Sequence, residues 1–268
     1  MSDQELLAEF VAIWRRAAAD FTALARTIDE NQWDLPTDLE GWSVKDNVAH
    51  TAHLEAVLAG ASEESIEVAE QPHLKNLTGY YTEQGVIARR GRSMTELADE
   101  IDSAVATRAA TLQQDPPTDA TATPPRTPGG VPWNNGTLLS NRPLDIWMHE
   151  QDIRRAIDRP GGFDSPAAEH VIGVFSRSLP MVLGKKVGAS AGTSVLLDVE
   201  GRRFGAQVGQ DGRAVAVVPD DPDVTVTLSA ADYVVLAGGR RSVAHTNPEY
   251  DGDGDLGRRV LENLAVTP

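Results

Sequence analysis

Asp145 and His149 are the two residues whose types and spacing best suit metal chemistry in this chain. On a helix, side chains four positions apart lie on one face, with Cβ atoms about 5–6 Å apart. A carboxylate and an imidazole that point the same way supply two ligands of a zinc site. His50, which ends the segment GWSVKDNVAH, could add a third ligand from a second helix. A surface ion pair, or a buried histidine satisfied by the aspartate, would give the same spacing.

Asp152 follows His149 by three positions and therefore shares its helix face. It could be a fourth ligand, orient the His149 ring through a hydrogen bond, or pair with Arg154 or Arg155. We favour an orienting or structural role over ligation. Glu150 is expected to point away from this face, into solvent.

Two further histidines have to be weighed beside these candidates. His53 lies three positions after His50 and could share its inward face. His170 follows the expected start of a later helix and is interpreted as a surface residue. Neither residue is needed to complete a set of three ligands.

Apolar periodicity predicts four helices in the first part of the chain. They cover about residues 5–28, 43–59, 80–114 and 138–158, and a capping-box pattern at Ser93 allows the third to be divided. Pro143 predicts a kink in the last of these helices, or a helix that begins just before it. Residues 115–136 form a Pro-rich connection long enough to suggest a functional loop, such as a lid. Long connections between four helices predict a bundle whose sites are built from facing helices.

The pattern changes after about residue 160. Short β-branched segments predict strands at 193–199, 204–208, 214–218 and 223–228, with helices expected at 165–183, 229–237 and 255–264. We therefore predict an α+β protein. A helical bundle covers residues 1–160, and a small domain with an antiparallel sheet of about four strands covers residues 161–268.

Composition excludes several classes of protein. The net charge is −16, which disfavours binding to nucleic acid or to an anionic membrane surface. Neither a membrane span nor a signal peptide is recognisable. The chain has no cysteine, which fits a cytoplasmic location and removes any thiol nucleophile of the protein's own. Thiol chemistry here would need an external thiol.

Arg240 and Arg241 follow two glycines after the helix expected at 229–237. Two flexible residues followed by two cations could present a guanidinium to an anionic ligand. A helix C-terminus with favourable charges explains the same residues, and on the residues alone we favour that explanation.

The segments GWSVKDNVAH (41–50) and DIWMHEQDIRRAI (145–157) resemble the mycothiol-dependent maleylpyruvate isomerase family. The segments SAADYVVLAGGR (229–240) and GDGDLGRRVLENLAV (252–266) are similar to the C-terminal domain of that family. The resemblance covers nearly the whole chain. It implies a DinB-like four-helix bundle followed by a small sterol-carrier-like α/β domain.

The resemblance also implies a site. A divalent metal, usually zinc, would be held by His50, Asp145 and His149, with Asp145 standing where the family more often has Glu. An arginine, matched by Arg240 or by Arg241, would assist with the substrate. We assign Arg240 as the catalytic residue on this basis.

The implied chemistry uses mycothiol as an external thiol cosubstrate. Three protein ligands leave an open coordination position, where an entering thiol is deprotonated. Addition to a cis double bond, rotation and loss of the thiolate would isomerise a maleylpyruvate-like acid, and displacement on an electrophile would make the protein an S-transferase. The expected partners are therefore mycothiol and a small electrophile or unsaturated acid. A non-catalytic metal-binding or small-ligand-binding regulatory protein is the alternative.

Overall fold

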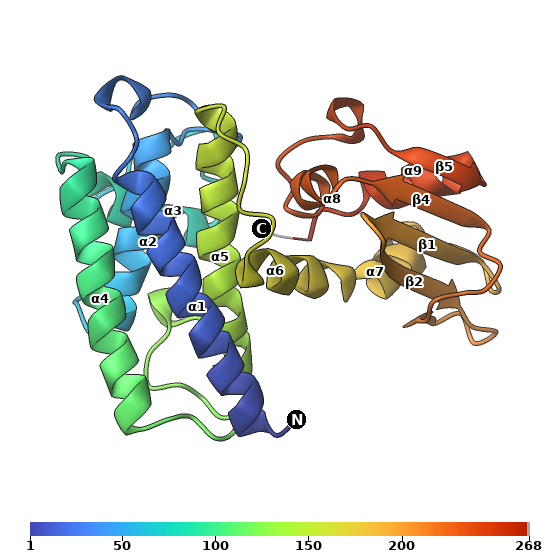
Figure 1. Cartoon of the computed structure of the whole chain (residues 1–268), viewed down its shortest axis with the longest axis horizontal. Helices are drawn as coiled ribbons and strands as arrows, with labels where there is room; N and C mark the ends of the chain where they lie inside the picture. Colours follow the sequence, from blue (N-terminus) through green and yellow to red (C-terminus); the bar gives the residue numbers. More distant parts are fainter. Residues whose placement is uncertain (267–268) are drawn as a thin grey trace. The chain divides into compact units, whose positions relative to one another are not determined.

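The structure is a computed structural model that describes residues 1–266 and divides into two compact units (Figure 1). The first unit is Met1–His170, and the second begins at Val171. The boundary predicted at residue 160 follows the end of a helix, whereas the compact units divide further along, inside α6 (Pro166–Ser176).

Four long helices form the bundle of the first unit: α1 (Asp3–Ala25), α2 (Val44–Leu58), α4 (Met94–Gln114) and α5 (Asn135–Ala156). Helices α1 and α2 each pack against both α4 and α5 (Figure 1). A shorter helix, α3 (Leu77–Ile87), packs against α2, and two 3-10 turns lie at Glu30–Gln32 and Pro128–Gly130. The predicted bundle is confirmed.

Capping residues in the sequence determine where three of these helices begin. Ser2, Ser43 and Ser93 each cap a helix, and each forms a capping box with the acidic residue three positions later. The box at Ser93 separates α3 from α4, as the sequence pattern allowed. Helix α5 begins at Asn135 and continues through Pro143, so it does not start just before that proline. The interior is filled by large side chains that include Trp14, Phe21, Leu97, Ile101, Ile146 and Trp147.

The Pro-rich connection between α4 and α5 is tied to the bundle by hydrogen bonds. The amide of Ala120 donates to Asp3 Oδ2 at 2.9 Å, and Arg126 Nη1 donates to the carbonyl of Ala61 at 2.6 Å. The amide of Gly129 donates to Glu63 Oε1 at 3.2 Å. A lid role for this segment stays a prediction.

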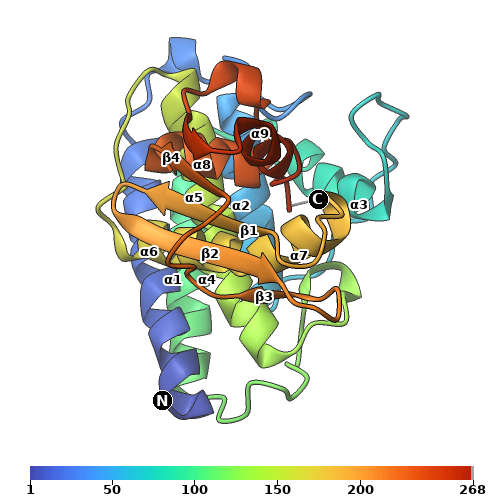
Figure 2. The same ribbon diagram turned by 90° about the vertical axis from the view of Figure 1, so that its right-hand side faces the viewer.

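The second unit is built on a five-stranded sheet in the order β3-β2-β1-β4-β5. Figure 2 shows β3, β2, β1 and β4 side by side in this sheet. The strands are β1 (Ser194–Val199), β2 (Arg202–Val208), β3 (Ala214–Ala216), β4 (Val224–Leu228) and β5 (Glu249–Gly252). Helical segments follow α6 at α7 (Leu179–Met181) and the π-turn Val182–Lys186, then at α8 (Ala230–Ala237), the 3-10 turn Val243–His245 and α9 (Gly254–Glu262).

The α+β fold class is confirmed, but two details predicted for the sheet are wrong. The sheet is mixed, because β1 pairs with β4 in parallel while the other neighbouring strands are antiparallel. Strands β2 and β3 extend the sheet from one edge of β1, and β4 then fills the opposite edge. A fifth strand, β5, was missed because its sequence EYDG lacks the β-branched alternation used to recognise strands.

None of the helices within residues 1–266 is long and apolar enough to cross a membrane.

Candidate metal centre

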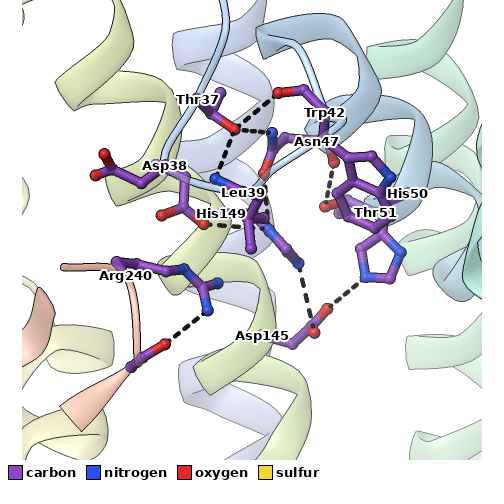
Figure 3. A network of polar contacts seen from close by, with 12 residues as sticks. Thr37, Asp38, Leu39, Trp42, Asn47, His50, Thr51, Asp145, His149 and Arg240 are labelled. Carbon is purple, nitrogen blue, oxygen red and sulfur yellow. Dashed lines mark hydrogen bonds and ion pairs between the residues drawn. The ribbon is translucent and has the colours of Figure 1, made fainter. Parts of the chain in front are cut away.

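His50, Asp145 and His149 converge between α2 and α5, with one possible ligand atom of each lying within 4.8 Å of the others. Nε2 of His50 is 3.5 Å from Oδ2 of Asp145, and Nε2 of His149 is 3.6 Å from Oδ1. The carboxylate therefore faces both imidazoles (Figure 3). Within residues 1–266, this is the one group of three or more such side chains close enough to share a metal ion.

The helical spacing predicted from the sequence produces this geometry. Asp145 and His149 are one turn apart on α5, and His50 projects from the facing helix α2. Both histidines are buried, at 4% and 6% exposure, whereas the Asp145 side chain keeps 21%. A donor set of two neutral imidazoles and one carboxylate is that of a three-ligand zinc site with an open position.

The ring of His149 is oriented by its other nitrogen. Nδ1 lies 2.8 Å from Oδ1 of Asn47, a buried residue on α2. An amide oxygen only accepts hydrogen bonds, so Nδ1 carries a proton, and in the neutral ring Nε2 is the nitrogen whose lone pair is left for a metal. Oδ2 of Asp152 lies 3.5 Å from the same nitrogen. Asp152 also pairs with Arg155, so the structure puts it on the orienting side of the ring and not among the ligand atoms.

Asp145 is held in its ionised form. Burial alone would raise its pKa, but the charges of Arg142, His149 and His50 hold the pKa well below its usual range. Nη1 of Arg142 donates to Oδ2 of Asp145 at 3.1 Å. Arg142 was not among the predicted site residues, although it stands three positions before Asp145 on the same helix. An ionised carboxylate is the form that binds a metal.

The two histidines differ in their titration. Burial lowers the pKa of His50, and the nearby Asp145 offsets this only in part. For His149, burial also lowers the pKa, but the carboxylates of Asp145 and Asp152 outweigh it and raise the pKa. The protein surroundings thus favour the neutral form of the His50 ring and the protonated form of the His149 ring.

Trp42, from the matched segment 41–50, forms one wall of the centre. Its ring centroid lies 4.8 Å from that of His50 and 5.9 Å from that of His149 (Figure 3). The indole Nε1 donates to Oε2 of buried Glu83 at 2.9 Å, which fixes the ring. Arg90 pairs with the other oxygen of Glu83 at 2.8 Å. A half-buried aromatic ring therefore lies against both imidazoles.

Two neighbours of the predicted ligands lie elsewhere. His53 is fully buried, and its ring packs 5.3 Å from that of Tyr81, outside the three-residue cluster. Glu150, expected in solvent, is buried at 2% exposure and pairs with Arg154 at 2.7 Å. The expectation was wrong because the segment after α5 folds back over this face: a Cβ on Gly162 would lie 2.9 Å from Oε1 of Glu150.

Arg240 belongs to the second unit, where it follows α8. Its Nη1 donates to the carbonyl of Gly238 at 2.8 Å, and its amide donates to the carbonyl of Val235 at 2.8 Å. Gly239 has a φ of +65°, which a glycine adopts without strain at a helix end. The two glycines thus terminate α8, and the substrate role of Arg240 stays a prediction.

The fold and the centre define a class of protein: a four-helix bundle with a histidine–aspartate–histidine centre, followed by a small α/β unit. Residues 14–154 match the family model of the mycothiol maleylpyruvate isomerase N-terminal domain, and residues 169–259 match the C-terminal domain of the same family. The chain belongs to the mycothiol maleylpyruvate isomerase family. The predicted family is confirmed, and with it the expectation of an enzyme of the isomerase class.

Two solved structures share the fold. One is a crystal structure of the mycothiol-dependent maleylpyruvate isomerase, 19% identical, with a TM-score of 0.55 over 90% of this chain and 92% of that chain. The other is a histidine-to-alanine mutant of the mycothiol-dependent maleylpyruvate isomerase, 17% identical, with a TM-score of 0.57 over 93% and 95%. A search among curated proteins finds no match.

Proposed function

We propose that this protein is a mycothiol-dependent isomerase of a cis-unsaturated acid of the maleylpyruvate type, and that it works with a divalent metal held by His50, Asp145 and His149. The observation that carries the proposal is the convergence of these three side chains within 4.8 Å in a chain of this family. Zinc is the metal proposed, because two imidazoles and one carboxylate in a three-ligand site suit it best.

The residues present fit such a metal. Asn47 holds His149 in the tautomer that turns Nε2 toward the centre, and the ionised Asp145 supplies the negative charge. When bound, the metal would offer an open coordination position in which a thiol loses its proton. The chain has no cysteine, so the thiol comes from outside.

The protein's own residues would then guide the reaction. The thiolate adds to one carbon of the cis double bond, the resulting single bond rotates, and loss of the thiolate restores the double bond in the trans form. Trp42, whose ring lies against both imidazoles, would help to exclude water from them. Arg240 is proposed to bind a carboxylate of the substrate or the enolate that develops on addition; Arg241 is the adjacent candidate for the same role.

The experiment is a rate assay with purified full-length protein, mycothiol and maleylpyruvate, before and after removal of metal. We expect isomerisation that needs both the thiol and the metal. A second arm replaces maleylpyruvate with a chromogenic electrophile, because S-transfer uses the same thiolate. Transfer without isomerisation would replace the isomerase proposal with an S-transferase. Absence of both reactions, in protein that does bind metal, would favour a non-catalytic binding protein.

A further inference from the structure

Arg142 links the two helices that carry the candidate ligands. Its side chain is 1% exposed, and its Nε donates to Oε1 of Glu55 on α2 at 2.9 Å, with Nη2 2.8 Å from the same oxygen. Its Nη1 donates to Oδ2 of Asp145 on α5 at 3.1 Å. One planar guanidinium therefore spans from the helix of His50 to the carboxylate that faces both imidazoles.

Glu55 is itself anchored by the other helices of the bundle. Its Oε2 accepts a hydrogen bond from Nε1 of Trp14 on α1 at 3.0 Å. Arg108 on α4 brings Nη1 to 3.8 Å from the same oxygen and lies over the Trp14 ring at 4.7 Å. Glu55 is fully buried on α2 and contacts side chains from the three other bundle helices, so Arg142 rests on a partner with little freedom to move.

Stability alone does not explain this arrangement. Buried ion pairs are often replaced by apolar residues without loss of stability, because removing two charges from water is costly. Here burial of the Arg142 charge is unfavourable, and the guanidinium donates a hydrogen bond to Asp145, a proposed metal ligand. Each carboxylate oxygen of Asp145 faces one imidazole, at 3.5 Å from His50 and 3.6 Å from His149, and the bond from Arg142 fixes the carboxylate plane in that position.

We propose that Arg142 is a positioning residue of the metal centre: anchored on Glu55, it holds the Asp145 carboxylate in the orientation that faces both histidines. This inference rests on the proposed function, because it presupposes that the three residues bind a metal.

Two effects of Arg142 on metal binding would have opposite signs, which makes the inference testable. A guanidinium repels a divalent cation, so at a pH where Asp145 is ionised in both proteins, removing a residue that acted only through its charge would tighten metal binding. Removing a residue that positions a ligand weakens metal binding, typically about 10–100-fold. The sign of the change therefore identifies the role.

The test measures Co²⁺ affinity of the full-length protein by competition with a chromophoric chelator, together with the visible spectrum of bound Co²⁺. We expect Arg142→Gln to weaken binding about 10–100-fold and to alter the spectrum. Arg89→Gln is the matched control, since it removes a buried arginine that pairs with Glu64 and Glu100 and contacts neither Glu55 nor Asp145. The control variant should bind Co²⁺ with the affinity and the visible spectrum of the wild-type protein.

The outcomes separate the two proposals. Unchanged or tighter Co²⁺ binding by Arg142→Gln, or equal losses in both variants, would overturn the positioning role while leaving the metal centre intact. Failure of the wild-type protein to bind Co²⁺ would overturn the metal centre itself. If Arg142→Gln does not fold, Arg142→Lys keeps a cation beside Glu55 but lacks the planar fork that also reaches Asp145, and a loss of affinity in the same direction is expected.

Discussion

Nδ1 of His149 lies 2.8 Å from Oδ1 of Asn47, across the gap between α5 and α2. This contact selects the tautomer of the neutral ring in which the lone pair of Nε2 is available to bind a metal. Asn47 is fixed in turn, because its Nδ2 donates to the carbonyl of Ser43 at 2.9 Å and to Oγ1 of Thr37 at 3.3 Å (Figure 3). The segment 41–50 thus supplies both a candidate ligand, His50, and the group that orients another ligand.

Asn47→Leu should weaken metal binding about 10-fold or more, because the His149 ring loses the acceptor that fixes its tautomer. Chelator competition would measure the change. Asn47→Asp keeps an acceptor at the same place and should retain most of the affinity. Thr51→Val is the matched control, since the Thr51 hydroxyl donates to the backbone carbonyl of Asn47, at 3.1 Å, and not to its side chain. Equal affinity in Asn47→Leu and wild type would contradict the orienting role.

Addition of Co²⁺ should change the tryptophan emission of the protein through Trp42, whose ring lies 4.8 Å from the His50 ring. A fluorescence titration of Trp42→Phe should show the response lost. Trp33→Phe is the control, because the Trp33 indole bonds to the carbonyl of Ile28 away from the centre. Persistence of the full response in Trp42→Phe would place the metal elsewhere.

Gly85→Ala should destabilise the first unit by about 1–3 kcal/mol, as other overpacked interiors do. A Cβ at this position would lie 2.1 Å from Cγ of His53. Urea unfolding would measure the loss, and His53→Ala in the same chain should recover much of it. Gly91→Ala is the control, because a Cβ there meets nothing within 4 Å. Additive effects of the two changes would show that Gly85 does not make room for His53.

The stability of the protein should fall in mild acid because of His53. Burial, reinforced by the charges of Arg89 and His50, lowers the pKa of His53 to about 3. The unfolded chain binds a proton here below about pH 6.5, whereas the folded chain does so only near pH 3. Unfolding free energy is therefore lost as the pH falls from 6.5 toward 3.

His53→Leu removes this contribution. Between pH 7 and pH 4.5, the wild type should lose about 2 kcal/mol more unfolding free energy than the variant. Urea titrations at several pH values would measure the difference, and the other titrating groups cancel in the comparison. Parallel pH profiles of the two proteins would show that His53 is not held neutral by burial.

The sequence predicted correctly those features that depend on a single helix. The one-turn spacing of Asp145 and His149 follows from helix geometry alone, and the capping boxes at Ser43 and Ser93 marked the starts of α2 and α4. The convergence of His50 with this pair depends on the packing of α2 against α5. That part of the prediction came from the family resemblance as much as from periodicity.

The supporting residues were missed for a physical reason. Glu55 and Arg142 meet across a helix interface at 2.8 Å, and Asn47 reaches His149 across the same interface. Such contacts depend on the rotation of each helix about its axis, which apolar periodicity fixes only coarsely. A buried Arg or Glu also resembles a surface residue in a hydropathy pattern, so the pattern gave no sign that the segment after α5 would cover Glu150.

Metal stoichiometry of the purified protein tests the central claim most directly. Elemental analysis of wild type and of His50→Ala, Asp145→Ala and His149→Ala should show about one divalent ion per wild-type chain and loss of that ion in the variants. His53→Ala should retain the metal, because His53 lies outside the three-residue cluster. Full metal occupancy in His149→Ala, or no metal in a wild type reconstituted with zinc, would contradict the account.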